Sequence, residues 1–322
     1  MDPAQFFAAS RLVIVAGKGG VGKTTVSATL ALAAARQGLT SLIVEVEGKS
    51  GLASMYGCPP FSYEEVTLAA DDPELGSAAV RGRTLTPDEA LVEYLEGAGM
   101  RRISKRLVSS GALDMVTTAV PGIRDLLVLA KVRQLETEGT ADLLVIDAPA
   151  AGHAITFLQS AAGLVDAVRL GPIHAQASAV LEMLDDPSRC QVILVTLPEE
   201  TPVNELVETA YQLEDRVGVS LGPVVVNGCY PILSGLDRDP EEAAEDARAS
   251  LRPGEPEALR AAAGFRTERT ALQTEQCARL NEALPLPQIR LPYLFDAELG
   301  PAQLDALAAA FLDGVRSLGG GR

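Results

Sequence analysis

The segment from Arg11 to Thr25 reads RLVIVAGKGGVGKTT, and it combines three local patterns in one short stretch. Leu12 to Ala16 is an apolar run rich in β-branched residues, long enough for a buried strand. A glycine-rich turn follows, and after Thr24 apolar residues recur at helical spacing. The order predicts a strand, a tight turn and the start of a helix, and we expect the rest of the chain to be arranged around them.

The turn GKGGVGKT, Gly17 to Thr24, is a full match to the phosphate-loop pattern G-x-x-x-x-G-K-[ST]. Phosphate oxygens must lie against several backbone N–H groups at once, so side chains must be absent and φ must be free. The next helix directs its unpaired N–H groups and positive dipole end at the anion. We expect Lys23 to reach the β- and γ-phosphates and the Thr24 hydroxyl to bind Mg²⁺. The predicted nucleotide-binding residues are Gly17, Gly19, Gly20, Val21, Gly22, Lys23, Thr24 and Thr25.

Two acids follow predicted strands and are candidates for the same site. Asp147 ends the apolar run that starts at Leu143, the usual position of the acid that holds Mg²⁺ directly or through water. Glu47 follows the predicted strand 41–46, and the carboxyl ends of parallel strands are where ligands bind. We therefore interpret Glu47 as the group that orients the attacking water. The alternative is that Glu47 is an exposed loop acid, because glutamates are common on surfaces.

Lys18 and His153 are less specific candidates. Lys18 lies early in the loop between two glycines and adds a second cation beside the phosphates, although a loop lysine can also be simply solvated. His153 follows Asp147 within the segment DAPAAGH, where a lone histidine fits a turn or a helix cap as well as a catalytic role.

Composition narrows the possible functions. The chain has 322 residues, 47% of them hydrophobic, and a formal net charge of −16. That charge argues against nonspecific nucleic-acid binding and against docking on anionic lipid. The four cysteines, Cys58, Cys190, Cys229 and Cys277, form no C-x-x-C pair, so the sequence supports neither a zinc ribbon nor a thioredoxin-type site. Scattered thiols, the lack of a long apolar run and an amino terminus without a basic start predict a cytoplasmic protein.

The order of apolar runs and helical segments predicts the fold class. The expected strands are near-continuous apolar runs at 12–16, 41–46, 66–70, 143–147, 191–197, 223–227 and 286–291. Helical segments separate most of them, which is typical of an α/β fold with a mostly parallel sheet covered by helices on both faces. We expect one P-loop NTPase domain over residues 1–322, with 51–140 as a mainly helical insertion. The apolar faces of that insertion serve either as ordinary core or as a groove for a partner helix.

With these motifs the chain resembles the ArsA/Get-type ATPases, the family of arsenite-pump ATPases and tail-anchored-protein targeting factors. The resemblance runs from Arg11 to about Phe295 and is carried by the following segments: GKGGVGKTT at 17–25, PGIRD at 121–125, DAPAAGH at 147–153, VVVN at 224–227 and LPLPQIRLP at 284–292. It is closest to the actinobacterial Get-like branch, whose members often occur as paired paralogues. Residues 47–50, EGKS, stand where that family has D-P-A-H, and the family's C-x-x-C is absent.

The resemblance implies an ATPase that binds ATP and Mg²⁺ and works as a homodimer, or as a heterodimer with a paralogous ATPase, opening and closing with hydrolysis. Lys18 would reach across the dimer to the partner's nucleotide. Lys23 and Thr24 would bind phosphate and Mg²⁺, Asp147 would be the metal-side acid, and Asn227 would bind adenine. The resemblance implies no nucleic-acid partner, and contact with membranes only through a cargo.

Other function classes remain open at this point. A low-activity nucleotide-binding subunit of a heterodimeric Get-like complex is the main alternative, because Glu47 is one methylene longer than the family's aspartate. A P-loop kinase or GTPase is a third possibility. The chain has no N-K-x-D guanine motif, since Asn227 is followed by Gly228 and Cys229, and this disfavours GTP. An iron–sulfur reductase of the nitrogenase-iron type would need cysteines on loops at the dimer face far from the nucleotide. The four cysteines of this chain do not lie at matching places.

Overall fold

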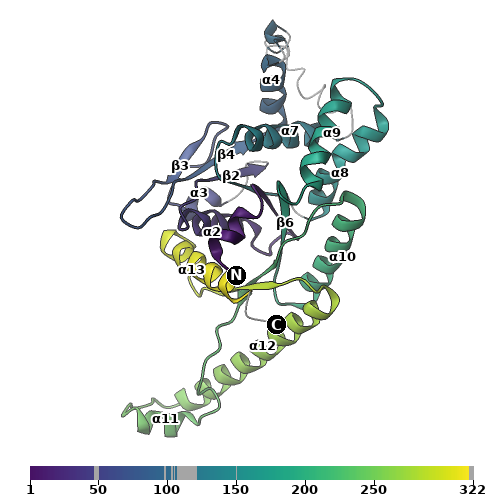
Figure 1. The fold of residues 1–322 in the computed structure, drawn as a ribbon. Coiled ribbons are helices and arrows are strands. Elements are labelled where there is room, and N and C mark those ends of the chain that lie inside the picture. Colours follow the sequence, from purple (N-terminus) through teal and green to yellow (C-terminus); the bar gives the residue numbers. More distant parts are fainter. Residues whose placement is uncertain are drawn as a thin grey trace.

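A computed structural model describes residues 1–46, 51–97, 99–102, 104, 106, 122–149 and 151–318. Eight strands form one sheet in the order β3-β4-β2-β5-β1-β6-β7-β8, and every neighbouring pair is parallel except β3 with β4. Helices cover both faces of this sheet (Figure 1). The α/β fold class predicted from the sequence is confirmed.

The strand that precedes the glycine loop, β1 (Leu12–Gly17), lies inside the sheet between β5 (Leu143–Asp147) and β6 (Cys190–Thr196). All six residues of β1 are buried, and alternate side chains enter opposite hydrophobic cores. Leu12 packs into one core and Val13 into the other. A strand buried on both faces needs an apolar residue at every position, which explains the unbroken run in the sequence. The remaining parallel strands are β2 (Ser41–Val46), β4 (Val80–Leu85), β7 (Val224–Cys229) and β8 (Gln288–Pro292).

The helices divide between the two faces. One face is covered by α1 (Pro3–Ala8), α2 (Lys23–Ala35), α3 (Leu52–Met55) and α13 (Pro301–Ser317). The other is covered by α7 (Ile123–Glu138), α8 (Ala151–Ala167), α9 (Pro172–Asp185), α10 (Glu200–Val217) and the carboxyl-terminal part of α12 (Glu255–Ala283). In the described part of the 51–140 segment, another helix, α4 (Pro87–Gly97), packs on α7. Within the described residues, no helix combines the length and the apolar character needed to cross a membrane.

One strand, β4, is not predicted by the sequence and lies inside the segment expected to be mainly helical. β4 pairs in parallel with β2, and β3 (Val66–Ala69) closes that edge of the sheet in antiparallel orientation. Two arginines interrupt the apolar run by which the other strands are recognised. Arg81 forms an ion pair with Glu65, 2.5 Å away, and the buried Arg83 stacks on the Tyr63 ring. Part of the 51–140 segment is therefore continuous with the central sheet. The sequence also predicts a helical segment near 101–110, and most of that range lies outside the described residues.

The amino-terminal part of α12 projects away from the sheet and carries α11 (Pro240–Asp246) at its far end (Figure 1). We refer to residues 231–272 as the arm. The three buried residues of α12, Gln273, Cys277 and Leu280, all lie in its carboxyl-terminal half, so this part anchors the arm to the sheet. The acid-rich stretch at this end of the arm forms α11, with Asp239 as its N-cap.

Candidate functional site

The glycine loop leaves the carboxyl end of β1 in a conformation that only glycine allows. A Cβ at Gly17 would lie 2.4 Å from the backbone oxygen of Val195 on the neighbouring strand, so no side chain fits there. Gly20 and Gly22 have φ angles of 85° and 89°, which L side chains rarely adopt. Gly22 is the N-cap of α2 and provides no side-chain cap, so the first N–H groups of that helix remain available to a ligand.

The end of β7 lies directly against the loop. The Asn227 side-chain amide donates a hydrogen bond of 3.0 Å to the Val21 carbonyl oxygen. A Cβ on Gly22 would lie 2.2 Å from the Asn227 Nδ2 atom. The sequence placed Asn227 on the adenine side of the site, and the structure brings it into contact with the turn that precedes α2.

Asp147 lies beneath the amino end of α2 and accepts two hydroxyl hydrogen bonds. The Thr24 hydroxyl donates to its Oδ2 atom at 2.8 Å, and the Ser27 hydroxyl donates to its Oδ1 atom at 3.1 Å. The contact follows from topology, because β5 is the parallel neighbour of β1 and the two strands end at the same edge of the sheet. The two residues predicted to bind the metal, Thr24 and Asp147, are therefore adjacent.

Burial shifts the pKa values of two side chains in this site, Asp147 and Lys23. Burial raises the pKa of Asp147, while the hydrogen bonds from Thr24 and Ser27 and the charge of Lys23 oppose the rise. Burial lowers the pKa of Lys23, and the charge of Asp147 opposes that change. The Lys23 ammonium also donates to the Lys18 carbonyl oxygen at 3.2 Å. A second buried acid, Glu45, is the sheet neighbour of Asp147 and contributes to the rise in its pKa.

Lys18 is directed away from the loop in this chain. Its ammonium forms an ion pair of 2.7 Å with Glu205 of α10, and 54% of the Lys18 side chain is exposed. The pair is intramolecular, so Lys18 is engaged within its own subunit. It is also near solvent, so the free energy that holds it is small, about 0–1 kcal/mol.

The remaining predicted site residues lie in the loop, in α2, near the start of α8 or outside the described residues. Gly19 and Gly20 are exposed, and Thr25 lies in the first turn of α2, where its carbonyl oxygen accepts from the Thr29 hydroxyl at 2.7 Å. Glu47 lies outside the described residues. His153 is exposed near the start of α8.

Three contacts of the site were not predicted from the sequence. Ser27 lies one helical turn after Lys23, a spacing that places both on the same face of α2. Glu45 is a lone acid in an otherwise apolar strand, and this pattern could have identified it, because an acid on a buried strand needs a partner. The Thr84 hydroxyl provides one at 3.0 Å. The contact of Glu205 with Lys18 joins distant segments and leaves no local signal in the sequence.

The donor set fits a nucleotide with Mg²⁺. The loop offers backbone N–H groups and Lys23 to an anion, and a Cβ at Gly17 or Gly22 would collide with its surroundings. A hydroxyl and a carboxylate oxygen, those of Thr24 and Asp147, are hard oxygen ligands of the type that Mg²⁺ prefers. Within the described residues, no group of three or more histidine, cysteine or acidic side chains could hold a metal ion by itself. Mg²⁺ commonly completes its coordination with phosphate oxygens and water.

Comparisons with known proteins agree with this reading of the loop. The sequence profile of the family described as Anion-transporting ATPase matches residues 10–169. The chain is 31% identical to ATPase BagA of Mycobacterium tuberculosis over 318 residues, which cover 89% of this chain and 88% of that protein.

More distant relatives share part of the chain. An Arsenical pump-driving ATPase of Escherichia coli is 26% identical over 69% of this chain and 35% of its own length. The ATPase get3 of Schizosaccharomyces japonicus is 26% identical over 52% of each chain. The loop geometry and the near full-length match lead to the same conclusion: this chain belongs to the ArsA/Get-type ATPase family.

Proposed function

We propose that this protein is a Mg²⁺-dependent ATP hydrolase whose nucleotide state switches the arrangement of a dimer. The observation that carries the proposal is the Thr24–Asp147 hydrogen bond directly below a glycine loop that opens onto the amino end of α2. This places a candidate metal-binding pair and a candidate phosphate cradle within a few ångströms of each other. Family membership supports the ATPase role.

The chain's own residues supply most of what phosphoryl transfer to water needs, which is positioning and charge neutralisation. The loop N–H groups and Lys23 would hold the β- and γ-phosphates, with the Lys23 ammonium exchanging the Lys18 carbonyl oxygen for phosphate oxygens. Thr24 and Asp147 would hold Mg²⁺, which when bound neutralises charge on the phosphate oxygens. We propose that Glu47 orients the attacking water.

Asn227 supports a preference for adenine nucleotides. Its bond to Val21 joins the end of β7 to the phosphate loop, so a base seated at that strand end is held in register with its phosphates. The side chain follows an apolar strand and precedes Gly228 and Cys229, a context without the acidic residue that guanine recognition uses. We therefore propose ATP as the nucleotide.

Dimerisation is the second part of the proposal, with either a second copy or a paralogous ATPase as the partner. Lys18 would leave Glu205 and approach the nucleotide held by the partner. The exposed ion pair costs little to break, about 0–1 kcal/mol, so the phosphates of a bound nucleotide can compete for this cation.

The alternative is a subunit that binds nucleotide but turns it over slowly without its paralogue. Glu47 in place of the family's aspartate motivates it. ATP turnover by the protein alone, and again with the paralogue added, separates the two. Turnover by the protein alone supports the hydrolase, whereas turnover that needs the paralogue supports the partner subunit.

The direct test is ATP hydrolysis by the wild-type protein and by Lys23→Ala. We expect the substitution to reduce kcat/KM by about 10²-fold or more, because it removes a cation from the phosphates. Arg252→Ala is the matched control, since it removes a side chain that is 87% exposed on the arm. Equal turnover in wild type and Lys23→Ala would refute the proposal.

A further inference from the structure

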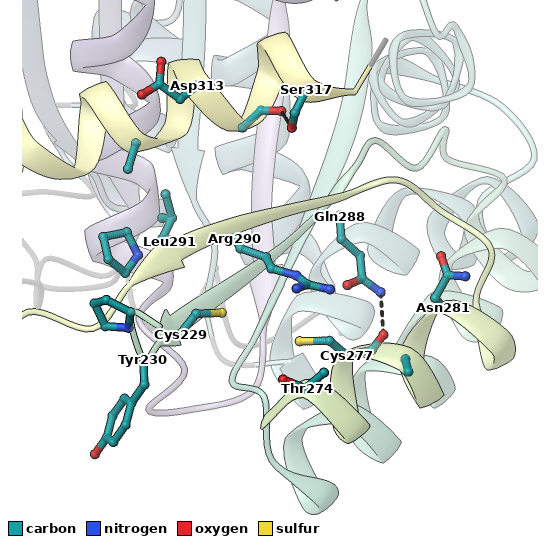
Figure 2. Close-up of a pocket in the computed structure, with 15 residues that line it drawn as sticks. Cys229, Tyr230, Thr274, Cys277, Asn281, Gln288, Arg290, Leu291, Asp313 and Ser317 are labelled. Carbon is teal, nitrogen blue, oxygen red and sulfur yellow. Dashed lines mark hydrogen bonds between the residues drawn. The ribbon is translucent and has the colours of Figure 1, made fainter. Parts of the chain in front are cut away.

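A pocket of about 850 Å³ lies at the free edge of the sheet, beside β8 and between α12 and α13. Its lining joins the end of β7 to the part of α12 that anchors the arm (Figure 2). Two of the four cysteines, Cys229 and Cys277, face this space from opposite elements. Neither belongs to the phosphate site, and no local pattern in the sequence pairs them, because they are far apart in the chain.

The thiols of Cys229 and Cys277 lie close enough for each to shift the pKa of the other, and the Cys229 thiol donates to the Val226 carbonyl oxygen at 3.5 Å. Figure 2 shows the two sulfur atoms directed toward one another below the guanidinium of Arg290. The other two cysteines occupy different surroundings. Cys190 begins β6 and is fully buried, and the Cys58 thiol lies against backbone oxygens of its own segment and of β3. Cys229 and Cys277 thus both line the pocket, Cys229 as a half-buried side chain and Cys277 as a buried one that is 3% exposed.

The surroundings favour one thiolate in this pair. The neighbouring Cys229 thiol lowers the pKa of Cys277, burial opposes this change, and the charge of Arg290 contributes to it. The neighbouring Cys277, together with burial, raises the pKa of Cys229. As pH rises, Cys277 therefore loses its proton first, which leaves a nucleophilic sulfur next to a thiol that still holds its proton. This is the arrangement in which a dithiol reacts with oxidants.

We propose that Cys229 and Cys277 form a redox-active dithiol, which a hydroperoxide converts into a disulfide that fastens α12 to the carboxyl end of β7. The Cys277 thiolate attacks one oxygen of the peroxide, which gives a sulfenic acid and releases hydroxide. The Cys229 sulfur then attacks the Cys277 sulfur, and the sulfenic hydroxyl leaves with the Cys229 proton as water. The two sulfurs lose two electrons, and the peroxide gains them. A dithiol reductant reverses the change and is itself oxidised to a disulfide.

The new bond would connect the arm to the nucleotide side of the sheet. Gln273, one helical turn before Cys277, already donates to the Gly228 carbonyl oxygen at 3.1 Å and accepts from the Tyr230 N–H at 2.7 Å. Cys229 lies two residues after Asn227, which contacts the phosphate loop. The disulfide would close a covalent loop around the whole arm and fix its anchor. Loop closure of this kind restricts the unfolded chain, so the oxidised protein is the more stable form.

The test treats the full-length protein with a slight excess of hydrogen peroxide, alkylates the remaining thiols in denaturant and maps the peptides without reduction. We expect a Cys229–Cys277 peptide pair that lacks two hydrogen atoms and separates after dithiothreitol, with Cys58 and Cys190 recovered as alkylated thiols. The rate of linkage should rise with pH as the thiolate fraction of Cys277 does, and this rise should occur at lower pH than for an ordinary cysteine.

Matched cysteine variants show whether the linkage depends on Cys277. Cys58→Ser should leave the linkage intact, whereas Cys277→Ser should abolish it and leave Cys229 as an alkylatable thiol. In the wild type, slower hydrogen exchange at residues 273–280 after oxidation, reversed by dithiothreitol, supports the fastening of α12. Recovery of Cys229 and Cys277 unlinked, or linked only between chains, under conditions that oxidise Cys58 would overturn the proposal. These readouts need no ATP, so they are independent of the function proposed above.

Discussion

Asp147 is a buried carboxylate that the fold holds with two hydroxyl hydrogen bonds and the nearby charge of Lys23. The acid is 6% exposed, and its ionised form is disfavoured by burial, so its position at the end of β5 carries a cost in stability. Residues held at such a cost cluster at functional sites. At the residue scale, Asp147 should therefore show opposite effects on stability and on activity.

We predict that Asp147→Asn abolishes most ATP turnover yet raises the free energy of unfolding at neutral pH. Asp147 has a higher pKa in the folded state than its ordinary value of 3.8, so the folded protein holds this proton more tightly than the unfolded chain. Below about pH 4 both states are protonated and the penalty disappears; it grows as pH rises toward the folded pKa and is constant above. Urea unfolding of both proteins at several pH values measures this. The prediction is wrong if the free energy of unfolding of Asp147→Asn, measured relative to wild type, falls as pH rises from acid to neutral.

The contact of Asn227 with the phosphate loop gives a second prediction at this scale. Asn227→Ala removes the bond to Val21 and should weaken ATP binding by about fivefold, the equivalent of about 1 kcal/mol for one hydrogen bond. Equilibrium titration with a fluorescent ATP analogue measures the change. Asn281→Ala, at an exposed position on α12, is the control and should bind like wild type. Identical affinity in both variants would show that Asn227 does not support the site.

Residues inside a local motif were predictable, and residues joined only by the fold were not. Gly17 to Thr24 carry a pattern that is set by the size of a phosphate group, and Asp147 ends a strand whose apolar run is visible in the sequence. The proximity of Thr24 to Asp147 follows from parallel neighbours that end at one edge. The pairing of Lys18 with Glu205, and of Cys229 with Cys277, depends on how distant helices pack on the sheet. Neither pattern exists in the linear chain.

At the scale of elements, β4 shows why strand prediction failed where it did. Between Val80 and Leu85 it carries two arginines with partners, a glycine and the buried Thr84, so no continuous apolar run marks it. Gly82 lies in the middle because a Cβ there would approach Phe61 and Leu68 within 2.9 Å. A glycine inside a strand usually indicates such a close approach. By contrast, α12 and α13 each begin with a glycine N-cap and an early proline, a helix-start signal that is visible in the sequence.

We predict that Gly82→Ala destabilises the protein by about 1–3 kcal/mol, because the new methyl group overpacks the sheet edge against Phe61 and Leu68. Urea unfolding measures the effect. Gly97→Ala is the matched control, since a Cβ there meets no atom within 4 Å, and it should change stability by less than about 1 kcal/mol. Equal effects of the two substitutions would mean that the space around β4 is not as tight as described.

At the scale of the whole molecule, the dimer remains a prediction with a clear measurement. An ATP analogue with Mg²⁺ should shift the protein from one chain to two in size-exclusion chromatography with light scattering, alone or with its paralogue. Lys18→Ala should weaken that shift, since this lysine is the cation proposed to reach the partner's nucleotide. Glu205→Gln, which frees the lysine, should leave it intact or strengthen it. A single chain in every mixture, at concentrations where nucleotide is bound, would contradict the dimer switch.

The central claim is that the loop from Gly17 to Thr24 grips the phosphates of ATP. Isothermal titration of the wild-type chain with ATP and Mg²⁺ tests it most directly, with Lys23→Ala and the arm control Arg252→Ala alongside. We predict binding of one nucleotide per chain, at least about tenfold weaker binding in Lys23→Ala and no change in Arg252→Ala. No heat of binding in the wild type, or equal affinity in Lys23→Ala, would contradict the account.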